Sequence, residues 1–326
     1  MSKVEEPYDG NAFFAISPLM IFPRALGRFK VFIRQAGRYV LYARENEHFT
    51  ERHRKKLHES GVTEVYVQSE QRQDYQVYVE RHLPQILADE VIPLDERTKV
   101  LRTAASAIVQ DVFDNKLPTG MTKREYARIF NFVEKATVFL AREEALRQIA
   151  SLVSHDYTIY SHCVQVFVYV TAILQALKAP ESLIVEAGVG AMLHDMGKMA
   201  IDKVLLQKPG PLTQEERRQI ETHPARGLAF CMDMPITPVV TACILFHHER
   251  LDGSGYPGGL SGEGIPMHVR ALAVADTYDA MTTRRSYAEI FTPFEALRIM
   301  RDDMPGAFDP DAFRTLVMVL SGAHII

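Results

Sequence analysis

Apolar and polar residues alternate along two short segments near the N-terminus. Phe29–Ile33 and Arg38–Tyr42 have the two-residue period of β-strands, and Gln35–Arg38 between them has the composition of a hairpin turn. A polar helix is predicted over Thr50–Ser60, followed by another strand over Val62–Val67. We therefore expect a small α+β unit at this end of the chain.

From Asp74 onward the apolar positions follow a helical period instead. One helix is predicted over Asp95–Asn115. Thr122 and Glu125 form a capping-box signature that opens a further helical pattern, which runs to about Val153. A helix of this length suits a connector between domains, one arm of a dimer, or a core helix. We expect a homodimer from the helix lengths alone.

These patterns predict a mainly α protein, in which long helices join a small α+β N-terminal domain to an all-helical C-terminal domain. At 326 residues the chain is long enough for two domains, each with its own core. We place a regulatory or dimerising domain at residues 1–93, a helical connector at 94–150 and a metal-dependent domain at 151–326.

Charge and cysteine content exclude some classes of function. The net charge of −4 argues against general binding to DNA or to an acidic membrane surface. The three cysteines, Cys163, Cys231 and Cys243, lie in apolar helical segments without C-x-x-C spacing. We expect them to be core thiols in a reducing compartment.

The longest strongly apolar run, Val164–Leu177, is interrupted by Gln165 and Gln175. It is shorter than the roughly 20 residues of a membrane-spanning helix, so a buried core helix is predicted and no membrane span. Met1–Gly10 is polar and acidic and has no signal-peptide pattern. A cytoplasmic protein is the resulting expectation.

Histidines and aspartates in the C-terminal half are the strongest indication of a catalytic metal site. The candidate metal ligands are His162, His194, Asp195, His223, His247, His248 and Asp276. A single histidine is more often a structural residue than a ligand. His194 and Asp195, however, directly follow the apolar segment Gly188–Leu193, where an unpaired buried carboxylate would cost several kcal/mol. A bound cation would remove that cost.

A two-metal site needs a bridging carboxylate with neutral imidazoles on both sides, and Asp195 is the natural bridge. A mixed nitrogen and oxygen ligand set favours first-row transition metals such as Fe or Mn, and two divalent ions are predicted. The adjacent His247 and His248 can both reach such a cluster from a helix end, and the glycine-rich segment Asp252–Gly259 supplies the loop that follows.

Taken together, these motifs resemble the HD-GYP domain family in order and approximate spacing, and the likeness covers residues 151–326. The matching motifs are His194-Asp195 with Gly197-Lys198, Lys208-Pro209-Gly210, His223-Pro224, His247-His248-Glu249, Asp252-Gly253-Ser254-Gly255-Tyr256-Pro257 and Ala275-Asp276. As a set they are highly specific, whereas an isolated His-Asp pair would carry almost no information.

The resemblance implies an all-helical HD fold with two or three metal ions. It also implies hydrolysis of cyclic di-GMP, by metal-activated hydroxide, to linear pGpG and onward to GMP, in second-messenger signalling. The implied partners are cyclic di-GMP itself and a diguanylate cyclase or another signalling protein.

The resemblance also implies a role for individual residues. His162, His194, Asp195 and Asp276 match the ligands common to HD proteins, and the second metal position is matched by His223, His247 and His248. Asp195 and Lys198 are the implied catalytic residues, and Lys198 also contacts the scissile phosphate. Arg285 matches an arginine that binds a substrate phosphate, and Tyr256 is the loop tyrosine near the ligand.

Two positions depart from the family pattern. Thr158 stands where members with a third metal carry a glutamate, so a binuclear site is predicted. Ala288 stands where a second phosphate-binding arginine is common. Either Arg284 substitutes for that arginine or the affinity for substrate is lower.

Nearby polar residues are expected to play supporting parts. Glu249 and Asp252 are candidates to orient ligand imidazoles, because a metal-bound histidine normally donates its other N–H group. Asp279 is expected only to support the helix that carries Asp276. Thr213 and Glu216 form a second capping-box signature.

Two other functions stay open. One is an HD-type phosphohydrolase for another nucleotide or cyclic dinucleotide, including a mixed cyclic GMP-AMP. The other is a noncatalytic cyclic di-GMP sensor that keeps the fold. Metal content separates a phosphohydrolase from a noncatalytic sensor, since a pure binding module need not hold two transition metals.

Overall fold

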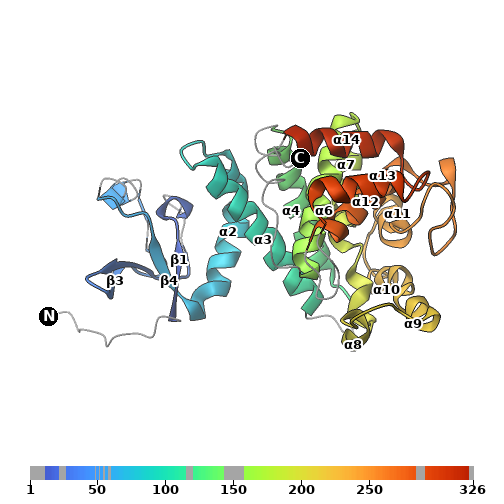
Figure 1. Ribbon diagram of the computed structural model, residues 1–326. Helices are drawn as coiled ribbons and strands as arrows, with labels where there is room; N and C mark the ends of the chain where they lie inside the picture. Colours follow the sequence, from blue (N-terminus) through green and yellow to red (C-terminus); the bar gives the residue numbers. More distant parts are fainter. Residues whose placement is uncertain are drawn as a thin grey trace. The chain divides into compact units, whose positions relative to one another are not determined.

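The computed structural model describes residues 12–21, 27–47, 49–50, 52–53, 56–57, 60–114, 120–142, 158–283 and 291–322. The chain divides into two compact units, Met1–Arg97 and Thr98–Ile326. Figure 1 shows a small sheet in the first unit, in blue, and the green to red helices of the second. A mainly α protein with a small α+β N-terminal unit is thereby confirmed, whereas the separate connector at 94–150 stays a prediction.

The first unit is built on an antiparallel sheet in the order β1-β4-β2-β3. Its strands are β1 (Phe13–Ile16), β2 (Val31–Gln35), β3 (Arg38–Ala43) and β4 (Val65–Gln68). The predicted hairpin is confirmed: Gln35 pairs with Arg38 across a turn in which Ala36 and Gly37 have φ of 47° and 80°. Two-residue hairpin turns favour this left-handed backbone because it matches the strand twist.

Aromatic side chains link the sheet of this unit to helix α2 (Arg72–Ala88). The ring of Phe14 in β1 lies 5.6 Å from that of Tyr75, and the ring of Phe29, just before β2, lies 5.3 Å from that of Tyr75 and 5.2 Å from that of Tyr78. Residues 52–53 and 56–57 of the helix expected over 50–60 are helical. Strand β1 was not predicted from the sequence.

Helix α6 (Ile159–Ala176) lies at the centre of the second unit. It packs against α7 (Glu181–Leu193), α12 (Met267–Thr282) and α14 (Pro310–Gly322), and every residue from His162 to Leu174 is buried. By length and hydropathy α6 is a candidate membrane span, but 72% of it is buried inside this unit. A helix that is apolar on all sides belongs in a protein core, so the predicted core helix is confirmed.

The chain forms further helices, the longest of 21 residues. They are α3 (Leu94–Asp114), α4 (Lys123–Leu140), η4 (Met196–Ala200), α8 (Lys203–Leu206), α9 (Gln214–Ile220), α10 (His223–Phe230), α11 (Pro238–Phe246) and α13 (Pro293–Asp302). Both predicted capping boxes are present, Thr122 with Glu125 at α4 and Thr213 with Glu216 at α9. Helix α4 ends at Leu140, earlier than predicted, and residues 143–153 of the expected helix lie outside the described residues.

Two glycines allow η4 and α10 to approach each other closely. A Cβ atom on Gly197 would lie 1.8 Å from the carbonyl oxygen of His223 and 2.5 Å from the amide nitrogen of Gly227. No side chain fits at these distances. Gly197 therefore brings the segment that carries Asp195 and Lys198 against the start of α10, where His223 lies.

We expect Gly197→Ala to destabilise the protein by about 1–3 kcal/mol or more, because an overpacked contact against backbone can be relieved only by moving the backbone. Urea unfolding of metal-free protein measures the change. The matched control is Gly264→Ala, where a Cβ meets nothing within 4 Å. Equal stability of the two variants would contradict the close approach.

Candidate metal centre

The seven predicted metal ligands gather at one place in the second unit, although five different segments supply them. Helix α6 supplies His162, the end of α7 supplies His194 and Asp195, the start of α10 supplies His223, the end of α11 supplies His247 and His248, and α12 supplies Asp276. All are buried except His248, whose side chain is 24% exposed. The grouping follows the expectation from sequence, while the ligand roles themselves stay predictions.

Asp195 lies at the centre of the cluster and is fully buried. Its Oδ2 atom is 3.5 Å from Nε2 of His162 and 3.6 Å from Nε2 of His194. Its Oδ1 atom is 3.4 Å from Nε2 of His223 and 3.9 Å from Nε2 of His247. Each oxygen of one carboxylate thus faces a different pair of imidazoles.

Asp276 approaches the cluster from α12. One of its oxygens is 3.1 Å from Nε2 of His162 and 3.7 Å from Nε2 of His194, and the other is 3.5 Å from Nδ1 of His248. This second carboxylate therefore links the His162 side of the cluster to the His248 side.

Backbone carbonyl groups orient three of the imidazoles. Nδ1 of His194 lies 2.7 Å from the carbonyl of Ala191, Nδ1 of His223 lies 2.8 Å from that of Ile220, and Nδ1 of His247 lies 2.9 Å from that of Ile244. Each carbonyl is in the last turn of a helix, where it has no partner within the helix. When Nδ1 donates to the carbonyl, Nε2 is left to bind a metal.

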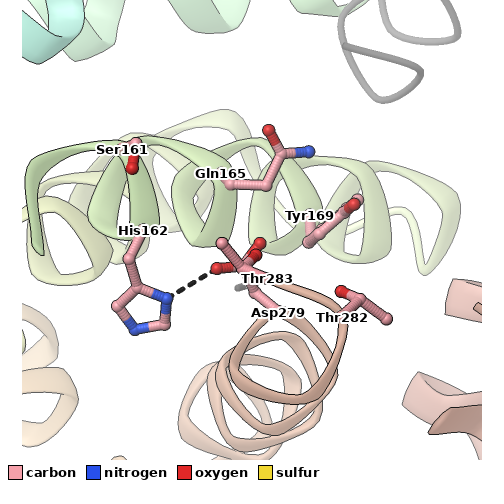
Figure 2. Close-up of a pocket in the computed structure, with 7 residues that line it drawn as sticks. All are labelled: Ser161, His162, Gln165, Tyr169, Asp279, Thr282 and Thr283. Atoms are coloured by element: carbon pink, nitrogen blue, oxygen red, sulfur yellow. Dashed lines mark hydrogen bonds and ion pairs between the residues drawn. The ribbon is translucent and has the colours of Figure 1, made fainter. Parts of the chain in front are cut away.

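His162 is oriented by a side chain instead. Its Nδ1 atom lies 2.6 Å from Oδ2 of Asp279, as Figure 2 shows. The expectation that Asp279 only supports the Asp276 helix was wrong: its carboxylate is buried against a predicted ligand. Asp279 lies three residues after Asp276, and residues three apart share one helix face. That spacing was the available sequence signal.

Burial controls the protonation of the cluster. It lowers the pKa of His223 to about 4 and that of His248 to about 3, and it holds the pKa of His247 well below its ordinary value. Burial acts to raise the pKa of Asp195, but Lys198 and three imidazoles keep it well below its usual range. Neutral imidazoles and ionised carboxylates are the forms that bind divalent cations.

The residues fit a metal site on two further counts. Nε2 of His194 and Oδ1 of Asp195 are buried without a hydrogen bond to any described residue. In addition, the ligand atoms form two groups, each within 4.8 Å, that share Asp195: one with His162 and His194, and one with His223, His247 and His248. Buried polar atoms normally have partners, and a cation at each group would satisfy both orphaned atoms.

The predicted substrate residues lie beside this cluster where they are described. The Nζ atom of Lys198 is 2.6 Å from Oδ2 of Asp195, and the ring of Tyr256 lies 4.7 Å from that of His248 at 30°. Arg284, Arg285 and Ala288 lie outside the described residues. Thr158 is the N-cap of α6, where its hydroxyl accepts a hydrogen bond from the amide of Ser161.

Glu249 holds the glycine-rich loop rather than an imidazole. Its carboxylate accepts hydrogen bonds from the amides of Gly258, at 2.6 Å, and Leu260, at 2.9 Å, and the residue is 1% exposed. Asp252 accepts from the amide and hydroxyl of Ser254. The expectation that these two acids orient ligand imidazoles was therefore wrong, because both serve the loop that carries Tyr256.

Gly255 brings this loop directly against the histidine pair. A Cβ atom at Gly255 would lie 2.5 Å from backbone atoms of His248, Glu249 and Arg250. The glycine next to the tyrosine is thus required by the packing of the loop on the segment that supplies two predicted ligands.

Comparison with known proteins agrees with this architecture. The chain matches the HD domain family over residues 144–312, which is more than half its length, and it belongs to that family. The HD-GYP resemblance found in the sequence falls within this family and agrees with the names of its relatives. The HD domain implies binding of divalent metal ions.

Individual relatives have names that state an enzymatic activity and a substrate. The chain is 39% identical over 179 residues to the cyclic di-GMP phosphodiesterase PA4108 of Pseudomonas aeruginosa, covering 55% of this chain and 43% of that protein. It is 31% identical over 160 residues to the 3′3′-cGAMP-specific phosphodiesterase 3 of Vibrio cholerae, covering 49% and 35%. The chain thus spans less than half the length of these two curated relatives.

A solved structure shares the fold over nearly the whole chain. Bd1817, an HDG"Y"P protein from Bdellovibrio bacteriovorus, matches with a TM-score of 0.67 at 19% identity and covers 95% of this chain and 99% of that one. The likeness includes both the all-helical unit and the small N-terminal unit.

We expect Glu249→Ala to loosen the Tyr256 loop while metal binding persists. Two buried amides would lose their acceptor, at about 1–3 kcal/mol for each unsatisfied group. Hydrogen–deuterium exchange of Gly258 and Leu260 should quicken relative to wild type and to the control Glu263→Ala, which changes an exposed residue of the adjoining segment. Unchanged exchange in Glu249→Ala would contradict this role.

Proposed function

We propose that this chain hydrolyses cyclic di-GMP to linear pGpG and onward to GMP at a binuclear metal centre bridged by Asp195. The observation that supports this most is the position of Asp195, whose two oxygens face two different pairs of imidazoles. Relatives named cyclic di-GMP phosphodiesterases support the choice of substrate.

The proposed ligands divide between two positions. His162, His194 and Asp276 would hold one ion, His223, His247 and His248 the other, and Asp195 both. Divalent ions there, proposed to be Fe or Mn, would lower the pKa of water and neutralise charge on a phosphate oxygen. The protein contributes a buried site whose imidazoles are already oriented by three helix-end carbonyls and one carboxylate.

Other residues would bind the substrate. Lys198 is half-buried beside Asp195, so its ammonium group can also attract a phosphate held at this site. Tyr256 packs at the edge of the cluster and would stack on a guanine base, a contact worth roughly 1–3 kcal/mol. We assign Arg285 to the second phosphate.

A second candidate substrate is 3′3′-cGAMP. The observation that favours it is the likeness to three Vibrio cholerae enzymes named as specific for that compound. The two substrates differ in one base and share both phosphodiester bonds. The proposed metal ligands would serve either of them, so discrimination would fall to residues that contact the bases.

A cytoplasmic location is part of the proposal, because all three cysteines are free and buried. The homodimer, and a diguanylate cyclase or other signalling protein as partner, remain predictions from sequence.

Asp195→Ala and Lys198→Ala should separate metal binding from turnover. Anaerobically purified wild type should hold about two metal ions per chain and hydrolyse cyclic di-GMP. Asp195→Ala should lose both properties. Lys198→Ala should keep its metal but lose about 10²–10³-fold in kcat, as expected when one preorganised charge is removed. Metal analysis and chromatography of products on the same samples give both readings.

The control for Lys198 is Lys203→Ala, an exposed lysine in α8. Assays with 3′3′-cGAMP run in parallel. If the protein holds its full metal content but hydrolyses 3′3′-cGAMP and not cyclic di-GMP, then 3′3′-cGAMP is the substrate and the proposed choice of cyclic di-GMP is wrong. Cyclic di-GMP binding without metal and without turnover would instead make the chain a sensor.

A further inference from the structure

Both ring nitrogens of His162 contact carboxylates from the same helix. Nε2 lies 3.1 Å from Asp276 and Nδ1 lies 2.6 Å from Asp279, three residues further along α12. His194, His223 and His247 instead use helix-end carbonyls. His162 lies inside α6, where the carbonyls are bonded within the helix, so its ring needs a side chain to fix it.

Asp279 projects from α12 toward α6 with its carboxylate against the imidazole of His162 (Figure 2). The residue is 3% exposed. Behind the contact is a small pocket, lined also by Ser161, Gln165, Tyr169, Thr282 and Thr283. A carboxylate that accepts from Nδ1 fixes Nε2 as the ligand nitrogen and makes the ring a stronger donor to a metal than a neutral acceptor does.

We propose that Asp279 is a positioning residue that sets the metal affinity of His162 through the contact of its carboxylate with Nδ1. The inference rests on the metal centre of the proposed function and adds a residue that positions one of its ligands.

Metal titration tests the positioning role without any substrate. Metal-free protein is titrated with Mn²⁺ alone, and free Mn²⁺ is followed by electron paramagnetic resonance. Asp279→Asn keeps the size and an acceptor oxygen but removes the charge, and the dissociation constant for the weakened site should rise about 10–100-fold. Asp279→Glu, which restores the charge, should recover part of the loss.

The matched control is Asp309→Asn. Asp309 is another aspartate of the second unit with a mostly buried side chain; it pairs with Arg270 and accepts from two amides at the start of α14. Its removal should lower the thermal midpoint of metal-free protein and leave Mn²⁺ affinity unchanged. If Asp279→Asn loses stability to the same extent yet binds Mn²⁺ like wild type, Asp279 is only a structural link and the proposal is overturned.

Should Asp279→Asn fail to fold, Asp279→Glu decides the matter, because it keeps the charge but displaces the carboxylate relative to Nδ1 of His162. Wild-type Mn²⁺ affinity in folded Asp279→Glu would then overturn the proposal. Wild type that binds Mn²⁺ but leaves cyclic di-GMP intact would refute the proposed function and not this inference.

Discussion

The buried charge of Asp195 is the constraint on which the second unit depends. A carboxylate with no solvent exposure is tolerated only when opposite charge or hydrogen bonds compensate for its lost hydration. Here Lys198 and four imidazoles surround it, and they come from α6 and the ends of helices distant in sequence. The tight crossing at Gly197 follows from the same need, because it brings His223 within reach of the carboxylate.

Carbonyl groups at helix ends orient three of the predicted ligand imidazoles. His194, His223 and His247 each lie at or just after the last turn of a helix, where a carbonyl without a helical partner accepts from Nδ1. Two otherwise unsatisfied groups thus satisfy each other, and Nε2 points into the cluster. His162 is the exception, because it lies within α6. Asp279 replaces the missing carbonyl there.

The sequence predicted the parts of this molecule that depend on local pattern. The Gln35–Arg38 turn, the capping boxes at Thr122 and Thr213 and the buried α6 all appear as expected. Motif order also predicted which side chains would gather around Asp195. The partners of Glu249 and Asp279 were missed, because they depend on how a loop folds back and how α12 crosses α6. No local pattern encodes those distances.

The most direct test of the account is a crystal structure of the protein loaded with Mn²⁺, with anomalous scattering used to locate the metal. The account predicts two peaks, both in contact with Asp195, one beside His162 and His194 and the other beside His223 and His247. A single peak, or two peaks that do not share Asp195, would contradict it.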